Sequence, residues 1–245
     1  MKIKYLFSIF LVITMTTQIS CKSKKQKKTK EKIVSQQGIK PESSNNSIQE
    51  VGSKEVSLSN GLRIKASEEE DFGDFKTYTQ IDILHNNQVI YSDSTQEYEF
   101  GNKLFPILNQ INPTAFEILL EVNDRPSKNK LKYLQIQGNK VTKEMEMPTF
   151  IAEAANLDED NILESAGFWD YPQMEESGKS VTTAYNPILY YEWTKNGLRL
   201  DSTLTIKKNT QIYGTFHGFN FREEVQIPVK QAELLTKEIE KIERK

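Results

Sequence analysis

The chain has 245 residues, of which 37% are hydrophobic and 27% charged, and its 32 basic and 34 acidic side chains give a formal net charge of −2. The charge is divided unevenly along the chain. Residues 1–55 hold 11 basic and 4 acidic side chains, whereas residues 56–245 hold 21 basic and 30 acidic side chains and have a formal net charge of −9. An acidic body repels nucleic acid and other anionic surfaces, and it suits a cation or a basic partner.

The first 20 residues have the three zones of a secretory signal peptide. Lys2 and Lys4 give a positive start, Leu6–Ile13 is apolar except for Ser8, and a short polar stretch leads to Cys21. The apolar run is too short to cross a bilayer as a helix. We therefore predict cleavage and export.

The segment Gln18-Ile19-Ser20-Cys21 resembles the lipobox of bacterial lipoproteins, although that family usually has leucine where Gln18 stands. The resemblance implies that Cys21 is acylated and becomes the first residue of the mature chain. We therefore expect a lipid-anchored protein of the bacterial cell envelope, either facing the periplasm or on the outer membrane. An ordinary secreted protein with one cysteine is the alternative, but such proteins rarely keep an unused thiol.

Residues 21–55 have the composition of a flexible tether. Seven lysines fall between residues 22 and 32, and a Ser/Asn/Gln-rich stretch with few apolar residues follows. Such a segment buries too little surface to offset its ordering entropy, so we expect it to be disordered. Next to a membrane its lysines would contact lipid headgroups rather than nucleic acid.

Residues 56–229 contain four two-residue turn signals between strand-like runs: Asn60-Gly61, Asn86-Asn87, Gly138-Asn139 and Asn196-Gly197. Asn and Gly tolerate the positive φ that tight hairpins require. The last three turns begin 52 and 58 residues apart, which is the size of a propeller blade. We predict a mainly β, antiparallel, hairpin-rich domain that is propeller-like or blade-derived, with a β-sandwich or an open antiparallel sheet as alternatives.

Residues 230–245 predict a short amphipathic helix. Leu235, Ile239 and Ile242 share one helical face among Glu and Lys residues. The apolar stripe is narrow and the other face is mixed in charge, so we expect the helix to dock on the domain rather than on a membrane.

Residues 156–164 place oxygen atoms at alternating positions, which converge in a tightly turning loop. The candidate ligands are Asn156, Asp158, Asp160, the backbone carbonyl of Ile162, and Glu164. Hard oxygen ligands in this number favour calcium. Asn161 stands at the sixth position, where a left-handed residue is needed, and asparagine adopts that conformation more readily than most.

This loop resembles the aspartate-rich loops of the calcium-binding FG-GAP or VCBS β-propeller repeats, in which D-x-D-x-D-G-x-x-D/E precedes a strand. The strand-like run 165–169 follows here. The resemblance implies a calcium site, but asparagine replaces both the first aspartate and the central glycine. A solvated polar turn is the alternative.

No catalytic signature is present. The two histidines are His85, beside a turn, and His217, in a run from 213 to 221 that alternates like a strand. No metalloprotease, nucleophile-elbow or phosphate-loop pattern occurs. We therefore predict a non-enzyme, with a carboxylate-dependent hydrolase of an envelope polymer as the alternative.

Aromatic residues are concentrated between 168 and 221. Many must belong to the core, but Trp169 and Tyr171 beside a turn would suit contact with an envelope protein or a glycan. Together these features predict a membrane-anchored, non-catalytic binding or scaffolding module, stabilised by calcium.

Overall fold

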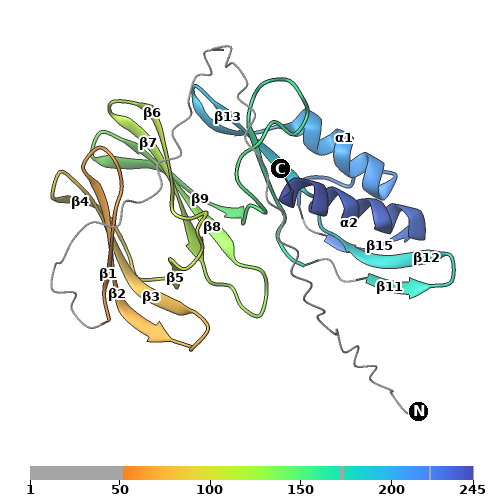
Figure 1. The fold of residues 1–245 in the computed structure, drawn as a ribbon, viewed down its shortest axis with the longest axis horizontal. Helices are drawn as coiled ribbons and strands as arrows, with labels where there is room; N and C mark the ends of the chain where they lie inside the picture. Colours follow the sequence, from red (N-terminus) through yellow and green to blue (C-terminus); the bar gives the residue numbers. More distant parts are fainter. Residues whose placement is uncertain (1–51, 172–173, 221, 245) are drawn as a thin grey trace, which may run out of the picture. The chain divides into compact units, whose positions relative to one another are not determined.

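The computed structural model describes residues 52–171, 174–220 and 222–244 (Figure 1). The predicted signal peptide (1–20), Cys21 and nearly all of the tether at 21–55 lie outside the described residues. Within these ranges the chain forms fifteen strands and two helices, and every strand pair is antiparallel. The predicted mainly β, hairpin-rich fold with a short C-terminal helix is confirmed.

The first part of the fold is a four-stranded meander. Its strands are β1 (Lys54–Ser57), β2 (Leu62–Asp71), β3 (Lys76–His85) and β4 (Gln88–Asp93). The turn residues Asn60, Gly61, Asn86 and Asn87 have φ values of 59°, 73°, 51° and 68°, as the sequence predicts for tight hairpins. Because β1 begins at Lys54, the sheet starts two residues before the predicted boundary.

A second four-stranded meander follows. Its strands are β6 (Ile107–Asn112), β7 (Ala115–Val122), β8 (Lys130–Gln137) and β9 (Lys140–Pro148). The short strand β5 (Tyr98–Glu99) pairs with both β3 and β7, and so joins the two meanders into one nine-stranded sheet.

One hydrophobic cluster contains side chains from both meanders. Ile64 and Ile83 come from the first, Phe116 and Leu134 from the second, and Tyr98 from β5, and each is 0% exposed. Buried residues alternate along β2, as expected when one face of a strand meets a core. Burial of these side chains is the main force that holds the meanders together.

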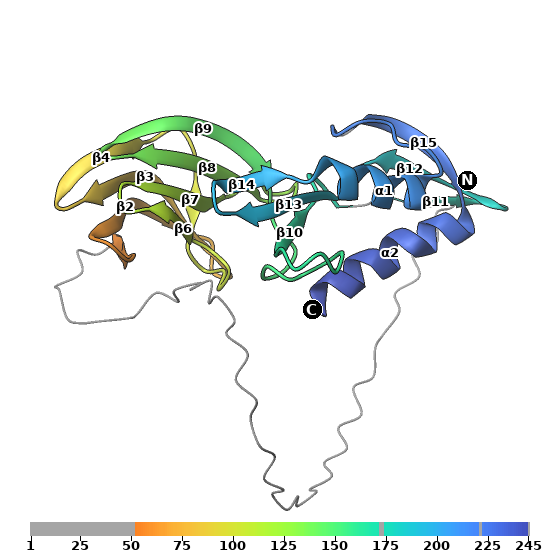
Figure 2. The same cartoon turned by 90° about the horizontal axis from the view of Figure 1, so that it is seen from above.

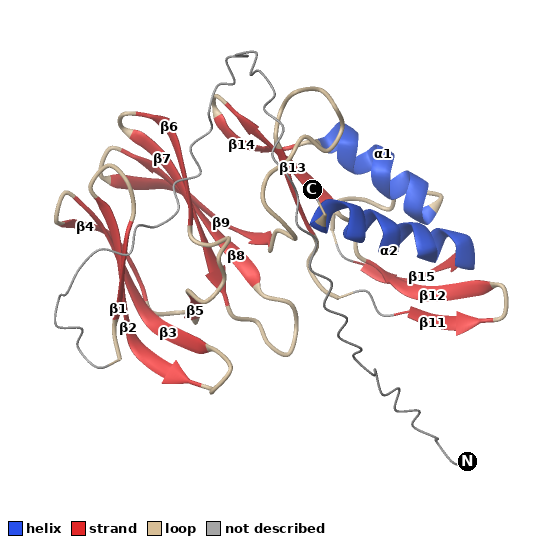
Figure 3. Ribbon diagram, viewed as in Figure 1, coloured by secondary structure: helices blue, strands red, loops and turns tan. Residues whose placement is uncertain are grey.

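The C-terminal part combines two three-stranded sheets with both helices (Figure 3). The elements are β10 (Glu164–Gly167), β13 (Leu189–Thr194) and β14 (Gly197–Leu200) in one sheet, β11 (Met174–Ser177), β12 (Ser180–Tyr185) and β15 (Arg222–Pro228) in the other, and α1 (Ser202–Tyr213) and α2 (Val229–Glu243). Helix α2 packs on β12 and β15, and α1 packs on β13 and α2 (Figure 2). Tyr185, Tyr190, Leu204 and Leu235 lie in their shared core. The C-terminal helix therefore docks on the protein, as predicted.

The hairpin spacing of 52 residues reflects a repeated meander, because the turns at 86 and 138 join equivalent strand pairs, β3–β4 and β8–β9. The spacing of 58 has no such basis, since the turn at 196 joins two strands of a three-stranded sheet. The described residues give no support to a propeller-like ring, because β5 fuses both four-stranded units into one sheet.

The expected strand over 213–221 is not formed. Tyr213 is the last residue of α1, and residues 214–220 form a loop. Gly214 has φ 76° and ends the helix in the left-handed conformation, a common helix stop. In this loop the Phe216 and Phe219 rings pack edge-on against each other, with centroids 4.9 Å apart, so the aromatic alternation does not reflect the two faces of a strand.

Candidate metal centre

The acidic loop at 156–164 is closed by a pair of backbone hydrogen bonds. Ala155 and Glu164 each donate an N–H to the other's carbonyl oxygen, at 2.9 and 2.8 Å. Glu164 is thus both the last residue of the loop and the first residue of β10. Leu157 anchors the loop from within, since its side chain is 8% exposed and lies in the C-terminal core.

Side-chain oxygens hold the turns of the loop. Asn156 Oδ1 accepts from the N–H of Glu159 at 2.6 Å, Asp158 Oδ1 from Asp160 at 3.2 Å, and Asp160 Oδ1 from Ile162 at 2.8 Å. Two residues take the left-handed conformation, Glu159 at φ 73° and Asn161 at φ 71°. The left-handed turn expected at the sixth position is confirmed. The local hydrogen bonds stabilise this conformation in residues other than glycine.

Three carboxylates meet at this loop. One oxygen from each of Asp158, Asp160 and Glu164 lies within 4.8 Å of the others. Asp158 and Asp160 are exposed, whereas Glu164 is 1% exposed. In the described part of the chain, no ion pair engages any of the three. Like charges at this separation repel one another, so the cluster favours a cation.

Glu164 is the most constrained member. Its Oε2 accepts from the backbone N–H of Leu157 at 2.6 Å, and its buried Oε1 has no hydrogen-bond partner among the described residues. Burial raises the pKa of Glu164 to about 7, opposed by the Leu157 bond and reinforced by Asp158 and Asp160. A buried oxygen without a partner is costly unless something supplies positive charge or a proton.

Among the described residues, the charged neighbours of Glu164 add no positive charge to the cluster. The side chain of Asp201 is buried and caps α1, accepting from the N–H of Leu204 at 2.9 Å, and it too raises the pKa of Glu164. Glu192, the strand neighbour of Glu164, is paired with Arg199 at 2.5 Å. The nearby guanidinium is therefore already engaged.

All five predicted metal ligands lie in this loop, but they have different roles. Asp158, Asp160 and Glu164 form the carboxylate cluster, and Asn156 uses its side-chain oxygen in the turn. Ile162 gives its N–H to the turn, and its side chain is 36% exposed.

The predicted aromatic surface is only partly exposed. Tyr171 is 60% exposed, but Trp169 is half-buried and its backbone N–H donates to Asn186 Oδ1 at 3.2 Å. The two predicted contact residues therefore differ in solvent exposure, and of the two only Tyr171 is mostly exposed.

Both histidines contact neighbouring side chains. The His85 ring is hydrogen-bonded through Nδ1 to Asn139 Oδ1 at 2.7 Å, where the β3–β4 and β8–β9 turns meet. The His217 ring packs edge-on against Tyr185, with centroids 5.0 Å apart.

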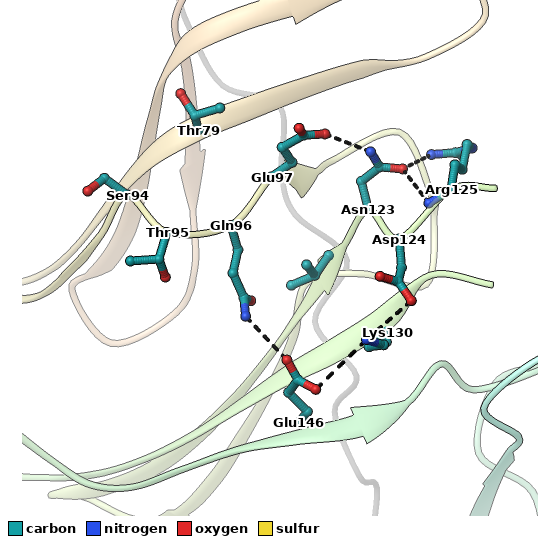
Figure 4. A pocket seen from close by; sticks show the side chains of 11 residues that line it. Thr79, Ser94, Thr95, Gln96, Glu97, Asn123, Asp124, Arg125, Lys130 and Glu146 are labelled. Atoms are coloured by element: carbon teal, nitrogen blue, oxygen red, sulfur yellow. Dashed lines mark hydrogen bonds and ion pairs between the residues drawn. The ribbon is translucent and has the colours of Figure 1, made fainter. Parts of the chain in front are cut away.

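A second candidate site, which the sequence did not reveal, is a groove in the nine-stranded sheet (Figure 4). We call it the polar groove. Its lining comes from β3, the link between β4 and β5, the end of β7 with the loop that follows, the start of β8 and the end of β9. No sequence spacing could have revealed it, because five separate segments contribute.

Comparison of the chain with protein-family models, with curated proteins and with solved structures gave no significant match. Among the residues that the structure describes, neither helix is long and apolar enough to cross a membrane.

Proposed function

We propose that this chain is a non-catalytic binding or scaffolding module of the bacterial cell envelope, anchored by lipid on Cys21, in which the loop at 156–164 holds calcium. The main observation behind the calcium site is the buried carboxylate of Glu164. Its Oε1 has no hydrogen-bond partner among the described residues, and the carboxylate lies within 4.8 Å of oxygens from two exposed aspartates.

Calcium suits this donor set better than a softer metal. The candidate ligands are all oxygens, and none of the three clustered side chains is histidine or cysteine. Calcium accepts six to eight oxygens at flexible geometry, so Asn156, the Ile162 carbonyl and water would complete the shell. Magnesium demands a stricter octahedron and is the weaker candidate.

The cation would act as a structural clamp. Glu164 begins β10 and pairs with Glu192 of β13, and Asp201 caps α1 nearby. Neutralising the cluster would therefore stabilise the sheet edge and the start of the helix together. This role fits a module that presents surface loops to a partner in the envelope.

The test is calorimetric titration of calcium chloride into the chain from residue 21 onward, carrying Cys21→Ser so that no lipid is added. We expect saturable binding to one site. At about 100 times Kd, calcium should add about 2.7 kcal/mol to the free energy of unfolding and raise Tm by roughly 5–10 °C.

Three variants assign the site. Glu164→Gln and the pair Asp158→Asn/Asp160→Asn should abolish the heat and the rise in Tm. Glu159→Gln is the matched control, because it removes the same charge from the same loop but lies outside the cluster. A wild-type chain without heat or a calcium-dependent Tm would reject the calcium site.

A further inference from the structure

The polar groove has the size and position of a ligand site. It measures about 450 Å³, which lies within the range of small-molecule sites, roughly 300–1,000 Å³. It lies near β5, which bridges the two meanders through two residue pairs with β3 and two with β7, and both strand residues and loop residues form its walls. Val122 is the one apolar residue in the lining.

The acidic side chains that line the groove are already paired with neighbouring amides or with Lys130 (Figure 4), and Arg125 pairs with Glu99 outside the lining. Glu97 accepts from Asn123 Nδ2 at 2.7 Å, and Asp124 pairs with Lys130 at 3.2 Å. Glu146 accepts from Gln96 Nε2 at 3.3 Å. Three acidic and two basic side chains thus leave little net charge, and neither an anion nor a cation is strongly favoured.

The remaining polar groups suit hydroxyl ligands. Hydroxyl groups of Thr79, Ser94 and Thr95 line the groove. Those of Thr79 and Thr95 donate to Glu68 and Asp93, at 2.8 and 2.6 Å, and keep lone pairs that can accept from a ligand hydroxyl. Gln96 Oε1 is buried without a hydrogen-bond partner in the described part of the chain. Amides and carboxylates held in place by their neighbours are preorganised to bond to several hydroxyls at once.

Two aromatic rings lie beside Arg125, a residue of the lining, although neither ring lines the groove itself. The Arg125 guanidinium, part of the lining, lies 3.9 Å from the centroid of the Phe75 ring. Phe75 stacks on Phe72 with centroids 4.8 Å apart, and Phe72 is 48% exposed. Phe72 therefore offers an exposed apolar face two ring contacts away from the Arg125 end of the groove. A sugar ring presents the matching pair of surfaces, C–H faces and a rim of hydroxyls.

We propose that the polar groove binds a neutral glycan. This proposal deepens the proposed role as a binding module by naming its partner class, and it does not depend on calcium. A small ion would not use the aromatic rings beside Arg125, and an anionic polymer would meet a groove without surplus positive charge.

The test starts with an array of neutral and acidic oligosaccharides, probed with the chain from residue 21 onward carrying Cys21→Ser, once with calcium and once with EDTA. Binding to neutral glycans is then measured by calorimetry on Asp124→Ala/Glu146→Ala. Both side chains are partly exposed, at 39% and 49%, so the fold should tolerate their loss. We expect affinity to fall about tenfold or more.

The matched control is Glu55→Ala/Glu240→Ala, which removes two ion-paired carboxylates of similar exposure, 37% and 52%, outside the groove. It should leave affinity unchanged. A Phe72→Ala variant should also weaken binding, because it removes the exposed ring.

Failure to bind any neutral glycan, or equal affinity of the groove variant and its control, would overturn the proposal. Either result leaves the calcium titration unaffected, so the two proposals fail separately. Shortened glycan products after incubation would support the groove as a glycan site but reject the non-catalytic role.

Discussion

Gly197 and Glu117 show how single residues join segments that are distant in sequence. Glu117, 1% exposed in β7, accepts the N–H of Leu198 at 3.1 and 3.0 Å through its two oxygens, and the Tyr133 hydroxyl at 2.7 Å. Gly197 lets this approach happen, because a Cβ there would lie 2.1 Å from Glu117 Oε1. The nine-stranded sheet and the β13–β14 hairpin are therefore linked at a point where no side chain fits.

We predict that Gly197→Ala lowers the free energy of unfolding by roughly 2–4 kcal/mol, because it adds a steric clash to an unfavourable φ of 108°. Gly138→Ala is the control, since it has φ 61° but no atom within 4 Å of the added Cβ. It should cost about 1 kcal/mol. Urea unfolding of both variants measures the difference, and equal losses would refute the contact.

Residues of the acidic loop show what local chemistry can and cannot predict. Asn161 takes the predicted left-handed turn, because its conformation depends mainly on its own side chain and its neighbours. Asp160 and Glu164 look equivalent in the sequence, yet one is exposed and the other is 1% exposed. Burial depends on what packs against the loop, and no spacing rule contains that information.

At the scale of elements, helix α1 was missed because its sequence is a poor helix former. It contains three threonines and two isoleucines, residues with low helix propensity. Tertiary contacts compensate, since Asn209 bonds both the N–H and the C=O of Ile188, at 2.9 and 2.8 Å. Thr205 accepts the N–H of Tyr190 at 3.1 Å. Polar helix side chains thus satisfy strand groups that would otherwise need another strand.

Strand β5 and its surroundings hold the two meanders together through a polar network. Asp93, at the end of β4, accepts from the hydroxyl of Tyr98 in β5 and lies 3.8 Å from Lys132 Nζ in β8. Burial alone would raise the pKa of Asp93, but hydrogen bonds from Thr95 and Tyr98 and the charge of Lys132 outweigh it and lower the pKa. The ionised form is therefore the one that stabilises the native state.

A depressed carboxylate pKa adds stability above the unfolded value of about 3.9, and this contribution is lost as pH falls through the folded pKa. We therefore predict that Asp93→Asn lowers Tm at pH 7 and that the difference from wild type shrinks below about pH 4. Asp71→Asn is the control, because the pKa of Asp71 is also lowered, but its side chain is 53% exposed. Melting curves from pH 2.5 to 7 test this, and a pH-independent deficit for Asp93→Asn would contradict it.

At the scale of the whole molecule, we expect an acidic, β-rich domain that a basic tether joins to a lipid anchor. One acyl chain binds a membrane only marginally, whereas several chains of about 0.8 kcal/mol per buried methylene anchor firmly. A neutral-glycan groove and a calcium loop would then lie on a body held near the envelope surface.

We predict that Cys21→Ser, introduced into the full chain and expressed in a bacterium, moves the protein from the membrane fraction to the soluble envelope fraction and abolishes labelling by radioactive palmitate. Cys21 is the one cysteine of the chain, so the change disturbs no disulfide. Lys24→Ser/Lys25→Ser is the control for the basic tether and should stay membrane-bound. A Cys21→Ser chain that remains in salt-washed membranes would rule out the lipid anchor.

The sequence by itself determined the hairpin turns, the turn conformation of the acidic loop and the C-terminal helix, because each depends on residues close together in the chain. The tertiary structure alone decided that β5 fuses two meanders, that α1 is helical, and that Glu164 is buried with one oxygen that no described residue bonds. It also assembled the polar groove from five segments. These features arise from strand pairing and burial across long sequence separations, where the partner of each residue is fixed only when the whole core packs.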